Sequence, residues 1–600
     1  MDQPRLRRWL VAALLLLCCA ARPPAPLAAQ NTYVISGTVV DARSRTPVAN
    51  ATVQVRSASQ TTVLRTLTDA AGRYTLRAAV SPGSYTLQYS LIGRGTQSRQ
   101  VTLGADRAVQ LDPVLLAPAA LELEELVVTG TGAPAERREV GNTVSSVNGE
   151  AVAASPGATA VDQALQGKIA GAEISETSGQ PGGGVSIRLR GTNTILGNAE
   201  PLIVVDGVIV DNNNSALIGL GANATRSNTA LTNRLADIAP DDIERVEVLK
   251  GAAAAALYGS RANSGVIQIF TKRGRQGTPR ISFRTELQGA RTPGFLRLNM
   301  EPRIGPADIA ADPSLGARRG QDTVRTDIQN RVFQTGIGTS NQLSVSGGSE
   351  GTTYYLSGNW NDEEGIIRST GYTRYGARAR VTQRLSSWLE VGLNGSFLNA
   401  RTSLVPEGEQ TQGILTSIIF TPTYFNPASF DSTAARFRYS PVIGTNVLDV
   451  IENWDAETQV TRFLGNVQLT ATPVRNLTVT YLAGLDDGRE EDRYLQPRFA
   501  TSATFNGSLQ TPVRSVRRFN NDVTASLESR VSDRLGLTST AGFRYTQDRT
   551  NIIRSAVSDL TPGFETLVGA VQSAEQSIVE LRTLATYFQE RVAIADRLFL

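Results

Sequence analysis

The fold is decided by residues 241–274, which read D-D-I-E-R-V-E-V-L-K-G-A-A-A-A-A-L-Y-G-S-R-A-N-S-G-V-I-Q-I-F-T-K-R-G. Val246 and Val248 alternate with other residues, so they face one side of a predicted strand. Ile267 and Ile269 repeat this spacing further along. The stretch therefore predicts two buried strands.

The residues between these strands predict a short helix. Gly251 would end the first strand, and the alanine-rich run 252–258 consists of the best helix former. Gly259 would terminate the helix, because glycine readily adopts the left-handed conformation that helix ends use. A strand, a helix and a second strand in this order predict a mixed α/β unit.

Three earlier segments extend this unit. They read D-Q-A-L-Q-G-K-I-A-G at 162–171, S-I-R-L-R-G-T-N at 186–193 and P-L-I-V-V-D-G-V at 201–208. By the period of two, Arg188 and Arg190 share one face of a strand and leave the opposite face for the core. Two adjacent guanidinium groups need carboxylate partners or water.

In order and spacing, these segments resemble the plug domain of the SusC/RagA family of TonB-dependent outer-membrane transporters. The resemblance implies a plug that blocks a wide β-barrel. It also implies that Arg188 and Arg190 tie the plug to acidic residues of the barrel wall; the alternative is a solvated charged face in a wet lumen. We interpret Asp206 and Gly207 as a structural turn after a strand. The residues that the motif marks are Arg188, Arg190, Gly191, Asp206, Gly207, Glu247, Lys250, Gly251, Tyr258 and Gly259.

Ahead of the plug, the octamer L-E-E-L-V-V-T-G at 123–130 resembles the TonB box of the same family. Its proposed core is Leu126, Val127, Val128, Thr129 and Gly130. The segment is a short β-branched strand beside flexible glycines, and we expect it to have no local partner. Such a strand can join the edge of another protein's sheet through main-chain hydrogen bonds. The alternative is an ordinary linker strand.

The remaining N-terminal sequence predicts a signal peptide and a small β-sandwich. Residues 1–29 combine basic residues, a short apolar run and a small-residue cleavage site. Residues 30–118 contain short alternating strands separated by turn signals, and they resemble a carboxypeptidase-regulatory-like domain. Such a domain is a spacer or a sensor and implies no peptidase. A linker with the TonB box would follow at 119–135, and the plug would occupy 136–276.

From residue 277 onward, segments of about ten residues alternate between polar and apolar positions, as in an outer-membrane β-barrel. Arg378 and Arg380 share a face that would point into the lumen, while Tyr375 and Ala377 would face lipid. The longer gap 401–453 would be an extracellular loop. The predicted strands are 280–289, 342–348, 353–361, 373–383, 388–398, 461–472, 477–485, 516–530, 535–546 and 578–595.

The predicted fold class is mainly β: a sandwich, an α/β plug and a transmembrane antiparallel β-barrel. The barrel strands number about half of the ~22 that plugged transporters have. A half barrel would leave strand edges unpaired in lipid. We therefore expect residues 277–600 to be the first part of the barrel of a longer protein.

The composition excludes several chemistries. The chain has no histidine, and its two cysteines, Cys18 and Cys19, lie in the expected signal peptide. Imidazole bases, thiol nucleophiles, disulfides and thiolate zinc sites are thereby excluded from the mature chain. The net charge of +4 falls to +1 once four arginines and one aspartate of the signal are removed. This balance gives no case for nucleic acid as a partner.

Two short motifs carry little weight. The pattern G-G-S-E-G at 347–351 matches a nucleophile elbow but lies in an expected hairpin turn. The oxygen-rich run 211–214 lacks calcium-loop spacing and is expected to be a polar surface loop. We expect no catalytic residue, no metal and no cofactor.

The resulting functional expectation is TonB-dependent import of an oligosaccharide or a peptide across the bacterial outer membrane, without enzyme activity. The resemblance implies three kinds of partner: the TonB–ExbB–ExbD complex, a SusD-like surface lipoprotein and outer-membrane lipid. The alternatives are a stand-alone siderophore or cobalamin receptor, a passive porin, and a secreted β-rich binding protein.

Overall fold

The computed structural model describes the greater part of the chain, and the chain divides into two compact units, Met1–Glu125 and Leu126–Leu600. No helix in the part described is both long and apolar enough to cross a membrane. The expected signal peptide, Thr129, Gly130 and Gly251 lie outside the described residues. The described residues are 31–42, 45–56, 62–91, 94–104, 106–116, 126–128, 134–136, 144–155, 157, 160–176, 178–191, 199–212, 217, 234–250, 258–406, 412–432, 436–500, 506–532, 535–595 and 598–599.

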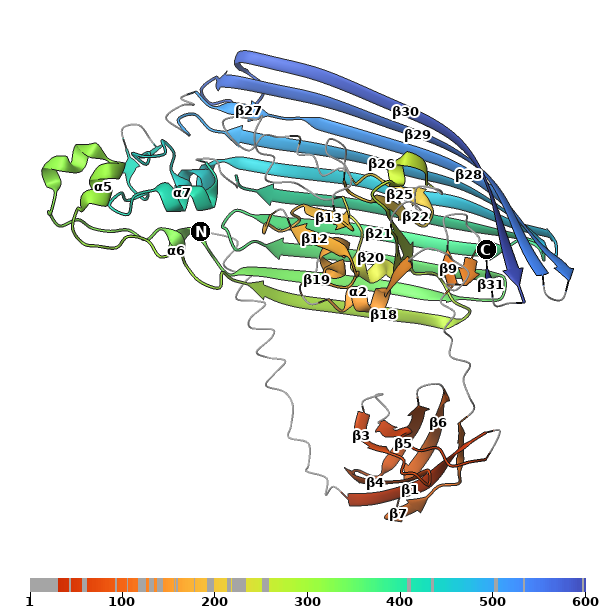
Figure 1. Ribbon diagram of the computed structural model, residues 1–600. Coiled ribbons are helices and arrows are strands. Elements are labelled where there is room, and N and C mark those ends of the chain that lie inside the picture. Colours follow the sequence, from red (N-terminus) through yellow and green to blue (C-terminus); the bar gives the residue numbers. More distant parts are fainter. Residues whose placement is uncertain are drawn as a thin grey trace. The chain divides into compact units, whose positions relative to one another are not determined.

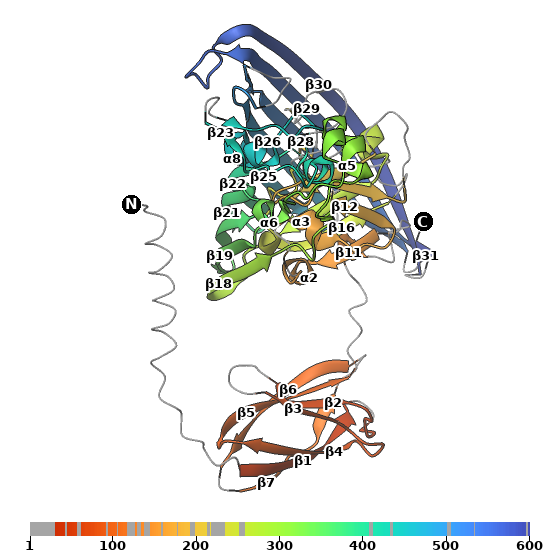
Figure 2. The same cartoon turned by 90° about the vertical axis from the view of Figure 1, so that its left-hand side faces the viewer.

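The first unit contains two β-sheets, as the sequence predicts. One has the order β4-β1-β7, with β8 also paired to β1, and the other has the order β3-β2-β5-β6. The strands, of which Figure 2 labels the first seven, are β1 (Asn31–Asp41), β2 (Thr52–Arg56), β3 (Thr62–Leu67), β4 (Arg73–Val80), β5 (Gly83–Leu91), β6 (Arg94–Leu103), β7 (Ala108–Gln110) and β8 (Val114–Leu116).

The alternation of buried and exposed residues along the strands shows where the core of this unit lies. Every second residue of β4 is buried, so one face of its sheet packs inward. Tyr74 of β4 and Tyr89 of β5 meet in this core, and their hydroxyl oxygens lie 2.7 Å apart. Burial raises the pKa of both phenols, so both stay neutral and one donates a hydrogen bond to the other.

In the second unit, the plug is built on a five-stranded sheet with the order β11-β16-β17-β14-β15, and β12 and β13 form a separate hairpin. The predicted strands around Val246 and Ile267 are β16 and β17, and both residues are fully buried. Of the predicted helix 252–258, only Tyr258 is described. The plug elements are β11 (Val144–Asn148), α2 (Gly149–Ala153), α3 (Val161–Leu165), β12 (Ala172–Glu176), β13 (Val185–Leu189), β14 (Leu202–Val205), β15 (Val208–Ile209), η2 (Pro240–Asp242), β16 (Ile243–Leu249), η3 (Gly259–Ala262) and β17 (Val266–Thr271).

A sheet of twelve antiparallel strands, here called the large sheet, curves around the plug (Figures 1 and 2). All ten predicted strands are present, and most are longer than expected. The sheet is open, with β18 and β31 as its end strands. Its strands are β18 (Gly277–Ala290), β19 (Gly336–Gly348), β20 (Thr352–Glu364), β21 (Gly371–Arg384), β22 (Leu389–Leu404), β25 (Asp455–Val474), β26 (Leu477–Gln496), β27 (Ser508–Gln510), β28 (Val513–Ser532), β29 (Leu535–Leu560), β30 (Gly569–Ile594) and β31 (Leu598–Phe599).

Connections at the two ends of the large sheet differ in length. Tight turns join β19 to β20 and β25 to β26 at one end, while long segments join β18 to β19 and β22 to β25 at the other. The segments 291–335 and 405–454 pack together on a shared apolar core that contains Val332, Val405 and Ile451. We call these segments the end lobe; the sequence predicts a long loop for the second and gives no prediction for the first. Its elements are α5 (Pro306–Ala311), η4 (Pro313–Arg318), α6 (Gln329–Val332), α7 (Ile414–Phe420), β23 (Phe430–Asp431), β24 (Arg436–Phe437) and α8 (Val447–Asn453).

The alternation of buried and exposed residues in the first unit can be tested by measuring the stability of two variants. Leu87 is fully buried on β5, whereas Ser84 of the same strand is exposed. In the isolated segment 30–118, Leu87→Ala should lower the free energy of unfolding by about 2–5 kcal/mol. Ser84→Ala should change it by less than about 0.5 kcal/mol. Urea denaturation followed by circular dichroism measures both, and equal effects would contradict the assigned strand faces.

Candidate functional site

The candidate site is the interface between the plug and the large sheet. Its first anchor is the turn between β14 and β15, where Asp206 has φ 46° and Gly207 has φ 86°. Two consecutive positive φ angles are typical of a two-residue hairpin, and Asp-Gly is a preferred pair for it. The structure thus confirms the predicted turn, and the turn points Asp206 at the large sheet.

Asp206 is held by side chains of β21 and β22. Its carboxylate accepts hydrogen bonds from Arg378 Nη2 at 2.9 Å, Arg380 Nη1 at 3.1 Å and Asn394 Nδ2 at 2.9 Å. The Thr271 amide of β17 adds a bond of 3.1 Å. Burial alone would raise the pKa of this carboxyl, but Arg380 and Arg378 hold it well below its usual range. Asp206 is therefore a charged anchor, a role that the turn interpretation missed.

Asp211, just after β15, forms a second anchor. Its carboxylate accepts from Arg514 Nη2 and Arg518 Nη2 of β28, both at 2.8 Å. Its amide donates to Asp486 Oδ2 of β26 at 2.7 Å. The expectation of a polar surface loop is therefore wrong for Asp211, because two arginines bury it; Asn213 and Asn214 lie outside the described residues.

Arg462 of β25 is the centre of a third anchor. Its guanidinium group contacts Asp486 through Nε at 2.7 Å and through Nη2 at 2.8 Å. Its Nη1 donates to Asp237 of the plug at 2.9 Å. A paired, planar contact of this kind fixes geometry as well as charge. One buried arginine thus holds a carboxylate of the sheet and a carboxylate of the plug at the same time.

Two further contacts lie near β18 to β20. Asp242 Oδ1 accepts from Gln342 Nε2 at 2.7 Å and from the Tyr355 hydroxyl at 2.9 Å. Arg284 Nη1 pairs with Asp241 at 2.8 Å. The plug therefore has aspartates along the side that faces the large sheet, and their partners on the sheet are mainly arginines.

At its tip, the β12–β13 loop of the plug contacts the end lobe. The Gln180 side chain donates to the Val405 carbonyl at 2.9 Å and accepts from the Val405 amide at 3.0 Å. Gly182, at φ 70°, lies so close to the Tyr372 ring that an added Cβ would come within 2.6 Å of it. Nothing in the sequence pattern marks Gln180, since its partner is 225 residues away.

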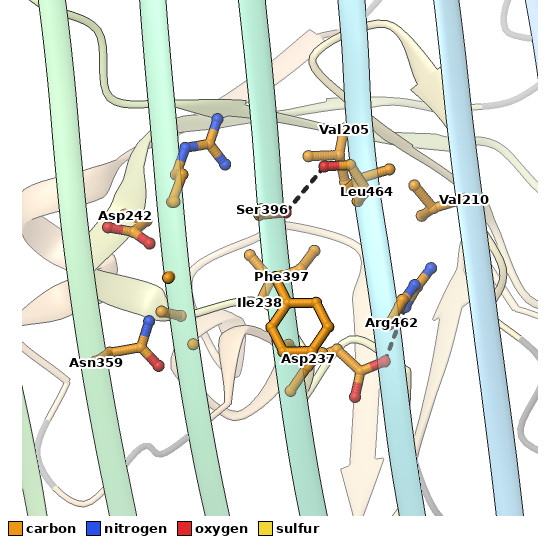
Figure 3. Close-up of a pocket in the computed structure, with 15 residues that line it drawn as sticks. Val205, Val210, Asp237, Ile238, Asp242, Asn359, Ser396, Phe397, Arg462 and Leu464 are labelled. Atoms are coloured by element: carbon orange, nitrogen blue, oxygen red, sulfur yellow. Dashed lines mark hydrogen bonds and ion pairs between the residues drawn. The ribbon is translucent and has the colours of Figure 1, made fainter.

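Figure 3 shows a small cavity between the plug and the large sheet, lined by Val205, Ile238 and Phe397 among others. Arg462 and Asp237 are joined at its edge. The cavity has a volume of about 50 Å³, which is space for ordered water rather than for a substrate. This part of the interface is closed to a nutrient-sized molecule.

The sequence prediction for the two motif arginines does not match this arrangement. Arg188 and Arg190 are exposed, and neither forms an ion pair with any described residue of the large sheet. Most of the ion pairs between plug and large sheet join a plug carboxylate to an arginine of the sheet, although Arg261 of η3 pairs in the opposite sense with Asp548 of β29. Ile187 and Leu189 do lie in the plug core, so the predicted strand faces are confirmed.

Most of the other marked residues form contacts within the plug, and Tyr258 also contacts the large sheet. Glu247 pairs with Arg245 at 2.7 Å, and Lys250 Nζ donates to Ser145 Oγ at 2.6 Å. The hydroxyl of Tyr258 accepts from Gln268 at 2.8 Å, and Arg544 of β29 lies over its ring. Gly191 and Gly259 have positive φ angles.

The proposed TonB box has a local partner, contrary to the prediction. Leu126–Val128 forms β9, which pairs antiparallel with β10 (Pro134–Glu136). The edge of β9 thus has a partner that is near to it in the sequence.

The described residues contain no group of three potential metal-ligating side chains. The serine of the G-G-S-E-G pattern lies in the tight turn between β19 and β20, where the Ser349 amide donates to the Thr352 carbonyl at 2.7 Å. This placement agrees with the expected hairpin turn.

The Asp206 anchor can be tested directly. Asp206→Asn keeps a residue that tolerates the turn but leaves Arg378 and Arg380 buried without a counter-charge. Losing one partner of a buried ion pair costs roughly 3–5 kcal/mol. Hydrogen exchange of β14 and β17 should therefore accelerate in the purified protein. As a control, Asp487→Asn removes the partner of exposed Arg517 and should cost at most about 1 kcal/mol. Unchanged exchange in Asp206→Asn would refute the anchor.

Comparison with known proteins agrees with this architecture. Residues 136–266 match the family model of the TonB-dependent receptor plug domain, and residues 34–116 match that of the carboxypeptidase regulatory-like domain. The plug match contains the five aspartates that contact the large sheet, Asp206, Asp211, Asp237, Asp241 and Asp242.

Relatives and solved structures extend the comparison to the large sheet. TonB-dependent receptor P26 of Formosa agariphila is 28% identical over 83% of this chain and 48% of its own length. TonB-dependent receptor SusC of Bacteroides thetaiotaomicron is 28% identical over 67% of this chain and 37% of its own. The chain thus spans less than half of the length of either relative.

Among solved structures, the RagAB peptide importer in its "closed-closed" state aligns with a TM-score of 0.61 at 22% identity. The alignment covers 76% of this chain and 54% of that one, and it shows a shared fold. The chain therefore carries a segment that matches the TonB-dependent receptor plug domain and is similar, over most of its length, to the SusC-like TonB-dependent receptors.

Proposed function

We propose that the protein imports a nutrient across the bacterial outer membrane, with the plug as a gate inside a β-barrel. The observation that carries the proposal is the two-sided character of the large sheet. Its concave face holds the plug through buried ion pairs, and its convex face exposes many large apolar side chains. An apolar exterior around a polar, plugged interior is the arrangement of an outer-membrane transporter.

The convex face supports a membrane position. Phe283, Tyr375, Leu393 and Phe463 project outward and are exposed. Trp360 and Tyr375 stack with ring centroids 6.4 Å apart, and aromatic girdles of this kind flank the apolar band of membrane barrels. Nearer the end lobe, charged residues replace apolar ones on the convex face of β26, β28 and β30. The exposed pair Arg517–Asp487 is an example. We infer that the membrane boundary crosses the sheet at this change.

Gating would act through the TonB box. TonB would displace β10 and pair with β9, and the energy of the proton-motive force would then pull on the plug through this strand. The anchors at Asp206, Asp211 and Asp237 have to break before a path opens. Transport of this kind breaks no covalent bond in the substrate, so the proposal involves no enzyme activity.

The cargo in this proposal is an oligosaccharide or a peptide, and a SusD-like lipoprotein would cover the end of the barrel where the end lobe lies. The likeness to SusC and to a peptide importer supports this pairing. A barrel that purifies alone from the native membrane, without a lipoprotein, would favour the stand-alone siderophore or cobalamin receptor instead.

The TonB box is tested by uptake. Val127→Pro removes one amide of β9 and prevents a regular ladder with any partner. We expect uptake to be lost while substrate binding at the cell surface is kept, and Val127→Ile should behave as wild type. Deletion of residues 126–130 should match Val127→Pro. Normal uptake by the deletion strain would exclude the mechanism.

The membrane position is tested by charge placement. Leu393→Arg puts a cation in the apolar band and should cost about 2–4 kcal/mol if the site lies near the bilayer midplane. We expect a clear loss of assembled protein in the outer membrane. Gln459→Arg, on the same face but nearer the end lobe, should assemble normally. Equal yields of the two variants would contradict the proposed boundary.

A further inference from the structure

An aromatic and basic cluster lies beside the end lobe. Phe499 lies in the segment after β26, and two guanidinium groups lie near its ring. The Cζ atoms of Arg436 and Arg498 are each 5.4 Å from the ring centroid. Arg436 also lies over the Tyr439 ring at 4.7 Å. Two segments far apart in the sequence thus build one surface of two guanidinium groups and two rings.

Hydrogen bonds hold this cluster in place. Arg436 Nη1 donates to the Tyr439 hydroxyl at 2.6 Å, and that hydroxyl donates to the Phe499 carbonyl at 2.7 Å. Burial raises the pKa of Tyr439 even though Arg436 is beside it, so the phenol keeps its proton and can donate. Arg498 Nη1 donates to the Leu560 carbonyl at 2.7 Å. The surface is therefore preorganised rather than assembled from free side chains.

Neither guanidinium group of the cluster forms an ion pair with a carboxylate in the described part of the chain, although Asp431 of β23 is the cross-strand neighbour of Arg436 on β24. Other arginines at this end of the large sheet do, including Arg493 with Asp455 at 2.8 Å and Arg517 with Asp487 at 2.9 Å. Two guanidinium groups beside one ring without a carboxylate leave a place for an anion.

The backbone at Phe499 is also unusual. Its φ angle is 62°, in the left-handed region that bulky residues rarely adopt. Such strain persists only where the surroundings enforce it, and it is concentrated at ligand-contacting positions. Phe499 is 37% exposed and lies beside both arginines.

We propose that this cluster binds a carboxylate-bearing sugar, such as the uronate units of an acidic oligosaccharide, as a recognition subsite of the importer. The planar guanidinium fork matches a carboxylate. The exposed Phe499 face matches the apolar face of a sugar ring, whereas an extended acidic peptide offers no such ring. The inference rests on the proposed import function and names its substrate class.

The test uses the full-length protein purified in detergent and an unbranched oligogalacturonate as the probe, with binding measured by calorimetry. We expect Arg436→Gln and Arg498→Gln each to weaken binding at least tenfold. Phe499→Leu, which keeps an apolar side chain but removes the ring, should weaken it several-fold. Arg517→Gln, which removes an exposed but paired arginine outside the cluster, is the matched control and should bind as wild type.

Two further probes separate charge from sugar recognition. The methyl-esterified form of the same oligomer keeps the sugar but loses the charge, and it should bind at least tenfold more weakly. Equal binding of the ester, or unchanged affinity in both arginine variants, would overturn the site. Oligoglutamate binding as tightly as the uronate would overturn the sugar assignment. Because these measurements need no TonB, their failure is distinct from a failure of the uptake test.

Discussion

The structure depends on buried carboxylates of the plug that meet arginines of the large sheet. Asp206 is held by Arg378 and Arg380, and Asp211 by Arg514 and Arg518. Taking such charges out of water is costly, so a pair of this kind adds little net stability over an apolar contact. Removing one partner is much more costly, because the other is left charged and buried. The anchors therefore define one seated position of the plug and penalise any other.

If the plug acts as the proposed gate, this arrangement would hold it in place and still allow its release. Contacts based on charge lose little when water replaces the partner, whereas an apolar core would have to be exposed. The plug has its own apolar core, centred on residues such as Val246 and Ile267, and Leu464 of the large sheet packs against its edge. Release from the sheet then hydrates ions and leaves that core intact. Gln180 ties the tip of the plug to the end lobe in the same reversible way.

Much of the fold could be predicted from the sequence, because alternation reports directly on strand faces. It gave all ten predicted strands of the large sheet and the inward orientation of Arg378. It failed at strand ends: β26 was expected to stop at Leu485 but continues to Gln496. Beyond Leu485 the outward positions are charged, so the apolar period ends while the hydrogen-bonded ladder continues. The anchors of Asp206 and the pairing of β9 were missed because both depend on partners that no local pattern identifies.

The central claim is that the plug must separate from the large sheet for transport. Val208 of β15 faces Gly484 of β26 so closely that a Cβ at position 484 would lie 2.7 Å from Val208 Cγ2. Because Cys18 and Cys19 are the only cysteines, Val208→Cys with Gly484→Cys would introduce a single, defined disulfide across the interface. We predict that the oxidised double variant binds substrate but does not import it, and that a reducing agent restores uptake to the level of the single variants. Full uptake with the disulfide intact would contradict the account.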